Sequence, residues 1–153
     1  MLKSGLIVGG VVLVLGVIAG ATLTPLCIPC LAVLGGLGSG YLAGQFDRPG
    51  AANAGARVGA GAGAIGGGGG LLGHLIAGGI NAVLVGPQGA SDILSQLGIP
   101  SSSNPTYYYA GAVGGAFCLG LFEVVLMAAL GAVGGLLWFQ ITGKNTSPPA
   151  PAM

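Results

Sequence analysis

The stretch from Gly55 to Gly79 constrains the fold of this chain more than any other part. Its sequence is GARVGAGAGAIGGGGGLLGHLIAGG, in which twelve of 25 residues are glycine and the only ionisable side chains are Arg57 and His74. In a helix in water, each glycine costs ~1 kcal/mol relative to alanine. In the hydrocarbon of a bilayer, an unbonded backbone group costs several kcal/mol, so helix becomes the default conformation. The stretch therefore predicts a membrane helix.

The composition of the whole chain favours the same environment. Of 153 residues, 53% are hydrophobic and only 5% are charged, and the mean hydropathy is +0.92. A soluble globular domain has about 25% charged residues. The net charge of +1 leaves no basic patch for nucleic acid. We therefore expect a multi-pass protein of the inner (plasma) membrane whose partners are the lipid bilayer and other membrane proteins.

The hydrophobic segments predict an all-α bundle of four transmembrane helices in a single domain, residues 1–143. A helix of ~20 apolar residues crosses the hydrocarbon core. The expected spans are residues 5–23, 29–45, 58–85 and 110–142. Between the last two spans we expect an outer loop, 86–109, with a short interfacial helix at 91–97. A Pro-rich tail, 144–153, is expected to be mobile.

Glycines spaced four residues apart recur in these spans. Such spacing places small residues on one face of a helix, where a neighbouring helix can approach closely. The glycines that we expect to pack helices together are Gly36, Gly40, Gly44, Gly55, Gly59, Gly63, Gly67, Gly70, Gly131 and Gly135.

The basic residues predict the orientation. With four spans, all four of them (Lys3, Arg48, Arg57 and Lys144) fall on one side of the membrane, and Asp92 is the only charged residue on the other. Because Lys and Arg are enriched on the cytoplasmic side of membrane proteins, both termini are predicted to be cytoplasmic.

Glu123 is the most unusual residue for a membrane span, because it lies within the apolar segment Phe117–Leu126. A carboxyl group inside a membrane costs a few kcal/mol and is a functional candidate by default. Two interpretations are open: Glu123 carries protons or binds an ion, or it is a neutral side chain that hydrogen-bonds to a neighbouring helix. His74 lies at a comparable depth in the preceding span, so we expect an intramembrane pair of His74 and Glu123 that requires no cofactor.

A pigment or haem ligand is the alternative for His74. Gly70, four residues earlier, would leave room for a flat macrocycle such as bacteriochlorophyll or haem beside the helix, as in light-harvesting polypeptides.

Cys27 and Cys30 form a C-x-x-C motif between the first two spans. On the predicted outer side of the membrane a disulfide is compatible with the compartment, and two buried thiols are the alternative. No metal site is expected, since zinc would need two further ligands.

Two segments, CLAVLGGLGSGYLAGQ (30–45) and AGARVGAGAGAIGGG (54–68), resemble small, uncharacterised, glycine-rich four-span membrane proteins of bacteria. The resemblance covers roughly residues 27–85 and implies the four-span fold, but the family has no known activity. The segment LGLFEVVLMA around Glu123 resembles the proteolipid subunits of rotary ATPases, which implies proton binding. Those subunits join their paired helices by a short cytoplasmic loop, whereas this chain has the long outer loop.

No catalytic constellation is present in the sequence, so we expect a non-catalytic structural or accessory subunit that packs within a larger membrane complex. Two alternatives stay open. One is a homo-oligomeric pore or transport protein with Glu123 lining the path, and the other is a carrier of protons, pigment or haem through Glu123 and His74.

Overall fold

The computed structural model describes residues 2–22, 27–98 and 104–144, and their side chains except those of residues 19–22, 27–29 and 93. These residues form four α-helices and a terminal π-helix: α1 (Leu2–Thr22), α2 (Cys27–Asp47), α3 (Ala52–Gln96), α4 (Pro105–Trp138) and η1 (Phe139–Gly143). The predicted all-α fold is confirmed for this part of the chain.

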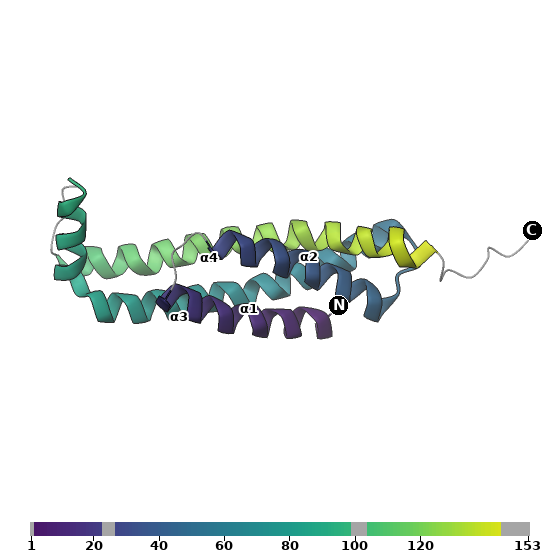
Figure 1. Ribbon diagram of the computed structural model, residues 1–153, viewed down its shortest axis with the longest axis horizontal. Helices are drawn as coiled ribbons and strands as arrows, with labels where there is room; N and C mark the ends of the chain where they lie inside the picture. Colours follow the sequence, from purple (N-terminus) through teal and green to yellow (C-terminus); the bar gives the residue numbers. More distant parts are fainter. Residues whose placement is uncertain (1, 23–26, 99–103, 145–153) are drawn as a thin grey trace, which may run out of the picture.

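The helices form an elongated bundle in which successive helices run in opposite directions (Figure 1). α3 and α4 are the longest helices and pack against each other more extensively than any other pair. The shorter helices α1 and α2 lie alongside only part of the length of α3 and α4. As a result, α3 and α4 extend beyond the other two helices at one end of the bundle.

A break at Gly86 divides α3 into two helical parts. Gly86 has φ 65° and ψ 171°, a conformation that only glycine adopts without strain. Pro87 then occupies the first turn of the second part, where its missing N–H costs no helical hydrogen bond. Residues 87–96 therefore form a separate helical arm, visible at an angle to the bundle in Figure 1.

The helices extend further into the predicted loops than we expected, and the short helix expected at 91–97 lies within the longer helical arm, residues 87–96. The predicted outer loop, 86–109, contains the helical arm and the start of α4, where the Asn104 side chain accepts a hydrogen bond from the Thr106 N–H at 3.0 Å. Capping by an Asn–Pro pair starts a helix without any apolar periodicity, which explains why the earlier start was not predicted. The tail beyond residue 144 lies outside the described residues.

Only residues 48–51 separate α2 from α3, although residues 46–57 were predicted as the linker. Arg48 ends α2 in a left-handed conformation with φ 42°, and its N–H donates to the Gly44 carbonyl at 3.0 Å. Glycine usually occupies this position at the end of a helix. An arginine in this left-handed conformation is therefore less favourable than a glycine would be.

Small side chains fill the inside of the bundle and large apolar side chains cover its surface. The buried hydrophobic residues are mainly alanines, with Val12, Met127 and Trp138, whereas Val83 and Leu84 are both 76% exposed. Leu34, Phe122 and Val125 are also more than half exposed. A soluble monomer rarely presents such a continuous apolar surface to water.

Two of the described helical segments are long and apolar enough to cross a membrane: Ala52–Gln96 and Pro105–Gly143. The apolar part of α1, Leu2–Ile18, is shorter. The structure therefore contains two helices that could span a membrane.

Glycines allow the backbones of neighbouring helices to approach closely. A Cβ atom built on Gly63 would lie 2.8 Å from the carbonyl carbon of Met127, and one on Gly67 would lie 2.6 Å from the Cα atom of Val124. No real Cβ atom fits at such distances. Each of the other predicted packing glycines likewise faces a neighbouring helix: Gly36, Gly40, Gly44, Gly55, Gly59 and Gly70 face α4, and Gly131 and Gly135 face α3.

Candidate functional site

Glu123 is the only buried ionisable side chain in the described part of the chain. It lies on α4, is 4% exposed, and points toward α3. The other two buried polar residues are Ser4 and Ser39, and the Ser39 hydroxyl donates to the Gly36 carbonyl at 2.9 Å. A buried serine hydroxyl can thus form its hydrogen bond within its own helix, whereas the Glu123 carboxyl group requires a partner on another helix.

The structure places His74 of α3 beside Glu123. The distance from His74 Nδ1 to Glu123 Oε2 is 3.1 Å, and Nδ1 also lies 2.9 Å from the Gly70 carbonyl oxygen. A Cβ atom on Gly70 would lie 2.7 Å from the carboxyl carbon of Glu123. Gly70 therefore leaves the space that the carboxyl group fills.

Two arrangements of one proton are compatible with these distances. When Nδ1–H donates to the Gly70 carbonyl, the buried Oε2 atom of Glu123 has no hydrogen-bond donor. When Glu123 is protonated on Oε2, it donates to Nδ1 and both side chains are satisfied. The heavy-atom distance fixes the contact, whereas the hydrogen position depends on the histidine tautomer. With the other ring nitrogen of His74 protonated, the second arrangement pairs Oε2 and leaves both side chains neutral, whereas the first is an ion pair in which Oε2 lacks a donor.

The space beside Gly70 does not fit a macrocycle. We considered it as room for bacteriochlorophyll or haem on His74, but the Glu123 carboxyl occupies it. Within the described ranges, no group of three or more His, Cys, Asp and Glu side chains could hold a metal ion.

The cysteine motif is only partly described. Cys30 and Cys118 are exposed, and neither forms a disulfide with another side chain that the structure describes. The Cys27 side chain lies outside them, so a Cys27–Cys30 disulfide stays a prediction.

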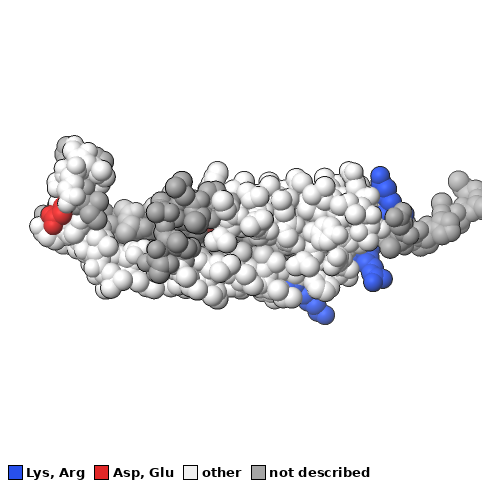
Figure 2. Space-filling model, in the orientation of Figure 1, with Lys and Arg blue, Asp and Glu red and all other residues white. Residues whose placement is uncertain are grey.

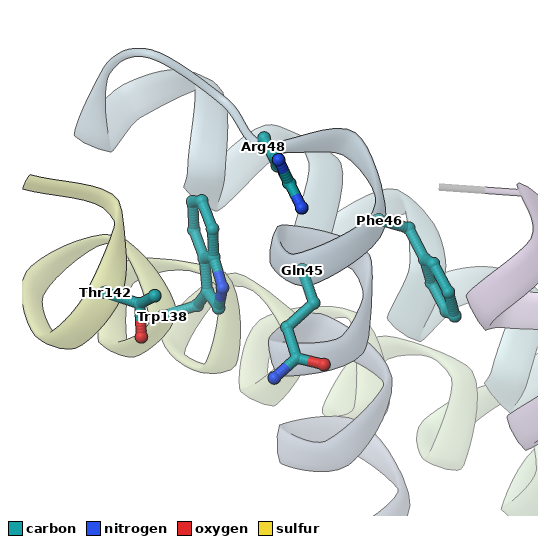
Figure 3. Close-up of a pocket in the computed structure, with 5 residues that line it drawn as sticks. All are labelled: Gln45, Phe46, Arg48, Trp138 and Thr142. Carbon is teal, nitrogen blue, oxygen red and sulfur yellow. The ribbon is translucent and has the colours of Figure 1, made fainter. Parts of the chain in front are cut away.

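A second polar site lies where α2 and α4 end, and the sequence alone did not indicate it. It is a cavity of about 480 Å³ lined by Gln45, Phe46 and Arg48 from the end of α2 and by Trp138 and Thr142 from the end of α4 and η1 (Figure 3). Trp138 is 2% exposed. Its Nε1 atom is buried without a hydrogen-bond partner. We refer to this cavity as the Trp138 pocket.

The basic residues lie toward one end of the bundle, and Asp92 lies at the other. Lys and Arg side chains gather at the end where α2 and η1 end, and an acidic side chain marks the helical arm at the opposite end (Figure 2). The arm contains a single acidic residue, Asp92. The Trp138 pocket thus lies at the basic end, and the His74–Glu123 pair lies within the apolar part.

No protein-family model, no curated protein and no solved structure matches this chain. Evidence on function therefore comes from the His74–Glu123 pair, the Trp138 pocket and the apolar surface of the bundle.

Proposed function

We propose that the chain is a four-span integral membrane protein that acts as a non-catalytic structural subunit of a larger membrane complex. The observation that carries this proposal is the distribution of side chains, with glycine and alanine inside and leucine, valine and phenylalanine outside. Such an arrangement is stable only when lipid or another apolar surface surrounds it.

The helix lengths support four spans. α1 and α2 each have 21 residues, which corresponds to about 31 Å, close to the ~30 Å of hydrocarbon in a bilayer. They run antiparallel to each other beside α3 and α4. A bundle of four antiparallel helices brings all four basic residues to one end, which favours cytoplasmic termini under the positive-inside rule.

The extra length of α3 and α4 supports a partner subunit. Pro105–Gly143 has 39 residues, or about 58 Å of helix, which exceeds the thickness of the hydrocarbon core. Residues near the arm, including Val83, Leu84 and Val113, remain more than half exposed. An apolar surface that α1 and α2 do not cover would be shielded by a neighbouring membrane protein.

The position of Glu123 favours a structural role over pore lining. Its carboxyl group contacts α3 of the same chain and is almost fully buried. A residue that lines a pore between subunits would face away from its own bundle. We therefore interpret the His74–Glu123 pair as a polar contact that fixes α3 against α4.

Gentle detergent extraction of the tagged chain from its native membrane, followed by native mass spectrometry and an absorption spectrum, tests the proposal. We expect stoichiometric co-purification with larger, unlike membrane subunits. A ring of identical chains would overturn the proposal in favour of a pore or a proton carrier. An absorption band beyond the aromatic region would favour the pigment or haem alternative.

A further inference from the structure

The Trp138 pocket carries an inference beyond the structural role. We propose that it binds the phosphate group of an anionic phospholipid, and this inference rests on the proposed insertion of the chain into a membrane.

The first argument is the unpaired donor. The indole N–H of Trp138 can only donate a hydrogen bond, and a buried donor without an acceptor is unfavourable. In Figure 3 its nitrogen lies on the edge of the indole ring nearest Gln45, not on the Thr142 side. The ring itself is held in place, since a Cβ atom on Gly44 would lie 2.6 Å from it. No acceptor among the described residues reaches this N–H, and a phosphate oxygen that reached Nε1 would supply one.

The second argument is the chemistry of the other lining residues. Among the described residues that line the pocket, Arg48 has the ionisable side chain, and Gln45 and Thr142 add an amide and a hydroxyl group. Arginine matches the oxygens of a phosphate group through two parallel hydrogen bonds. Asp47 precedes Arg48 but is not among the lining residues. A phosphate group would accept hydrogen bonds from Arg48 and Trp138 at the same time.

The backbone is unusual at both segments that line the pocket. Arg48 stands in the left-handed conformation at the end of α2, where glycine would be less strained. η1 is a π-helical turn that begins directly after Trp138 and contains Thr142, and such turns are frequent at functional sites.

The third argument selects a lipid rather than a free anion. Phe46 and Trp138 provide apolar walls, which suit the glycerol and acyl part of a phospholipid. The pocket lies at the basic end of an apolar bundle, at the level that headgroups occupy if the bundle crosses a bilayer. Basic pockets between helices at the cytoplasmic side bind anionic headgroups in this way.

The chain contains one tryptophan, so its fluorescence reports on the pocket directly. The purified full chain in detergent is titrated with phosphatidylglycerol, with phosphatidylcholine of the same acyl chains, and with inorganic phosphate. We expect phosphatidylglycerol to change the Trp138 emission with a stoichiometry of one lipid per chain, and the other two additives to leave it unchanged. The same response to inorganic phosphate would assign the pocket to a soluble anion and overturn the lipid proposal.

Variants separate the pocket from the general positive charge of this end. Arg48→Gln should weaken phosphatidylglycerol binding about tenfold, in line with the loss of one charge-assisted hydrogen bond. Arg57→Gln removes one positive charge from the same end but not from the pocket, and should change binding less than about twofold, as expected for a screened surface charge. Equal losses in the two variants would overturn the proposal.

Arg48→Gly provides a check that does not depend on a destabilised protein. Glycine relieves the left-handed backbone at this position, so the melting temperature should rise while phosphatidylglycerol binding falls as in Arg48→Gln. Unchanged binding in Arg48→Gly would contradict a role for the guanidinium group.

Flotation with phosphatidylcholine vesicles distinguishes this inference from the proposed function. If the chain floats with the vesicles but Trp138 does not respond to phosphatidylglycerol, only the lipid site is wrong. If the chain does not associate with vesicles at all, both proposals fail.

Discussion

Gly70, His74 and Glu123 form one contact in which each residue depends on the other two. Gly70 leaves the space for the carboxyl group, and His74 lies 3.1 Å from it. Glu123 is the natural partner for a histidine that has only apolar residues and glycines around it in sequence. The cost of placing a carboxyl group in an apolar helix is thus reduced by a partner on the adjacent helix.

A double-mutant cycle with His74→Leu and Glu123→Leu tests the pair in detergent micelles. Because hydrogen bonds between membrane helices contribute modestly, we expect a coupling free energy of about 1 kcal/mol in the unfolding equilibrium. Glu123→Gln should retain most of the stability, since its amide can still donate to Nδ1. Val125→Ala, at a position of α4 that is 68% exposed, is the matched control and should have little effect.

Losses that add to within ~0.3 kcal/mol in the double variant would show that the two side chains do not interact. In that case the proximity of the two residues would have no energetic consequence.

At the scale of the helices, glycine faces determine which elements pack and how closely. α3 presents Gly55, Gly59, Gly63 and Gly67 to α4, and α4 returns Gly131 and Gly135. On another face of α3, Gly69 contacts α1, where a Cβ atom would lie 2.8 Å from the Cα atom of Gly9. α3 can contact both helices closely because its glycines occupy more than one face.

Alanine substitutions at two glycines of α3 distinguish the contribution of helix packing to stability from that of helix propensity. In Gly63→Ala the added methyl group meets the backbone of α4 at Met127 and Ala128, so we expect a loss of ~1–3 kcal/mol in the free energy of unfolding. In Gly68→Ala nothing lies within 4 Å of the added methyl group. Helix propensity should then leave the stability unchanged or raise it by up to ~1 kcal/mol.

Thermal unfolding of both variants in the same detergent measures the difference. Similar melting temperatures for Gly63→Ala and Gly68→Ala would contradict the close approach of α3 and α4.

At the scale of the whole molecule, the two ends of the bundle differ in charge and the sides are apolar. The basic residues lie at one end, and the helical arm with Asp92 lies at the other (Figure 2). This polarity favours a fixed orientation, because moving the basic end across a membrane would require several cations to leave water.

Single-cysteine labelling tests that orientation. In a chain whose three cysteines are replaced by serine, Gly50→Cys reports the turn between α2 and α3, and Gln96→Cys reports the arm; both residues are exposed. An impermeant maleimide should label Gln96→Cys in intact cells and Gly50→Cys only after lysis. Labelling of both positions from the outside would contradict the membrane orientation proposed here.

Much of the fold could be predicted from the sequence because hydrophobicity and backbone hydrogen bonding act within each segment. Low charge and long apolar segments predict helices, and the all-α fold follows. The helical arm was predicted in part, as a short helix at 91–97, but its start directly after Gly86 was not, since Gly86 and Pro87 are typical of a loop. Its helix depends on the backbone conformation of one glycine, which the pattern of residue types does not report.

Of the two sites, the His74–Glu123 pair could be predicted from the sequence and the Trp138 pocket could not. Glu123 and His74 stand out in sequence because ionisable residues are costly in an apolar helix, and equal depths in adjacent spans brought them together as partners. From the sequence, the space beside Gly70 was interpreted as room for a macrocycle, whereas the Glu123 carboxyl group occupies it. The occupant of such a space can be identified only when the neighbouring helix is placed. The Trp138 pocket was not predicted at all, since its residues come from two segments about 90 positions apart.

The sequence was sufficient to predict helices and an apolar surface, because hydrophobicity and the need to satisfy backbone hydrogen bonds are properties of each segment. The three-dimensional structure was needed to show which glycine face meets which helix, which group fills the space beside Gly70, and which residues line the Trp138 pocket. These features depend on distances between segments, and thirty-four glycines offer many alternative faces that composition cannot distinguish.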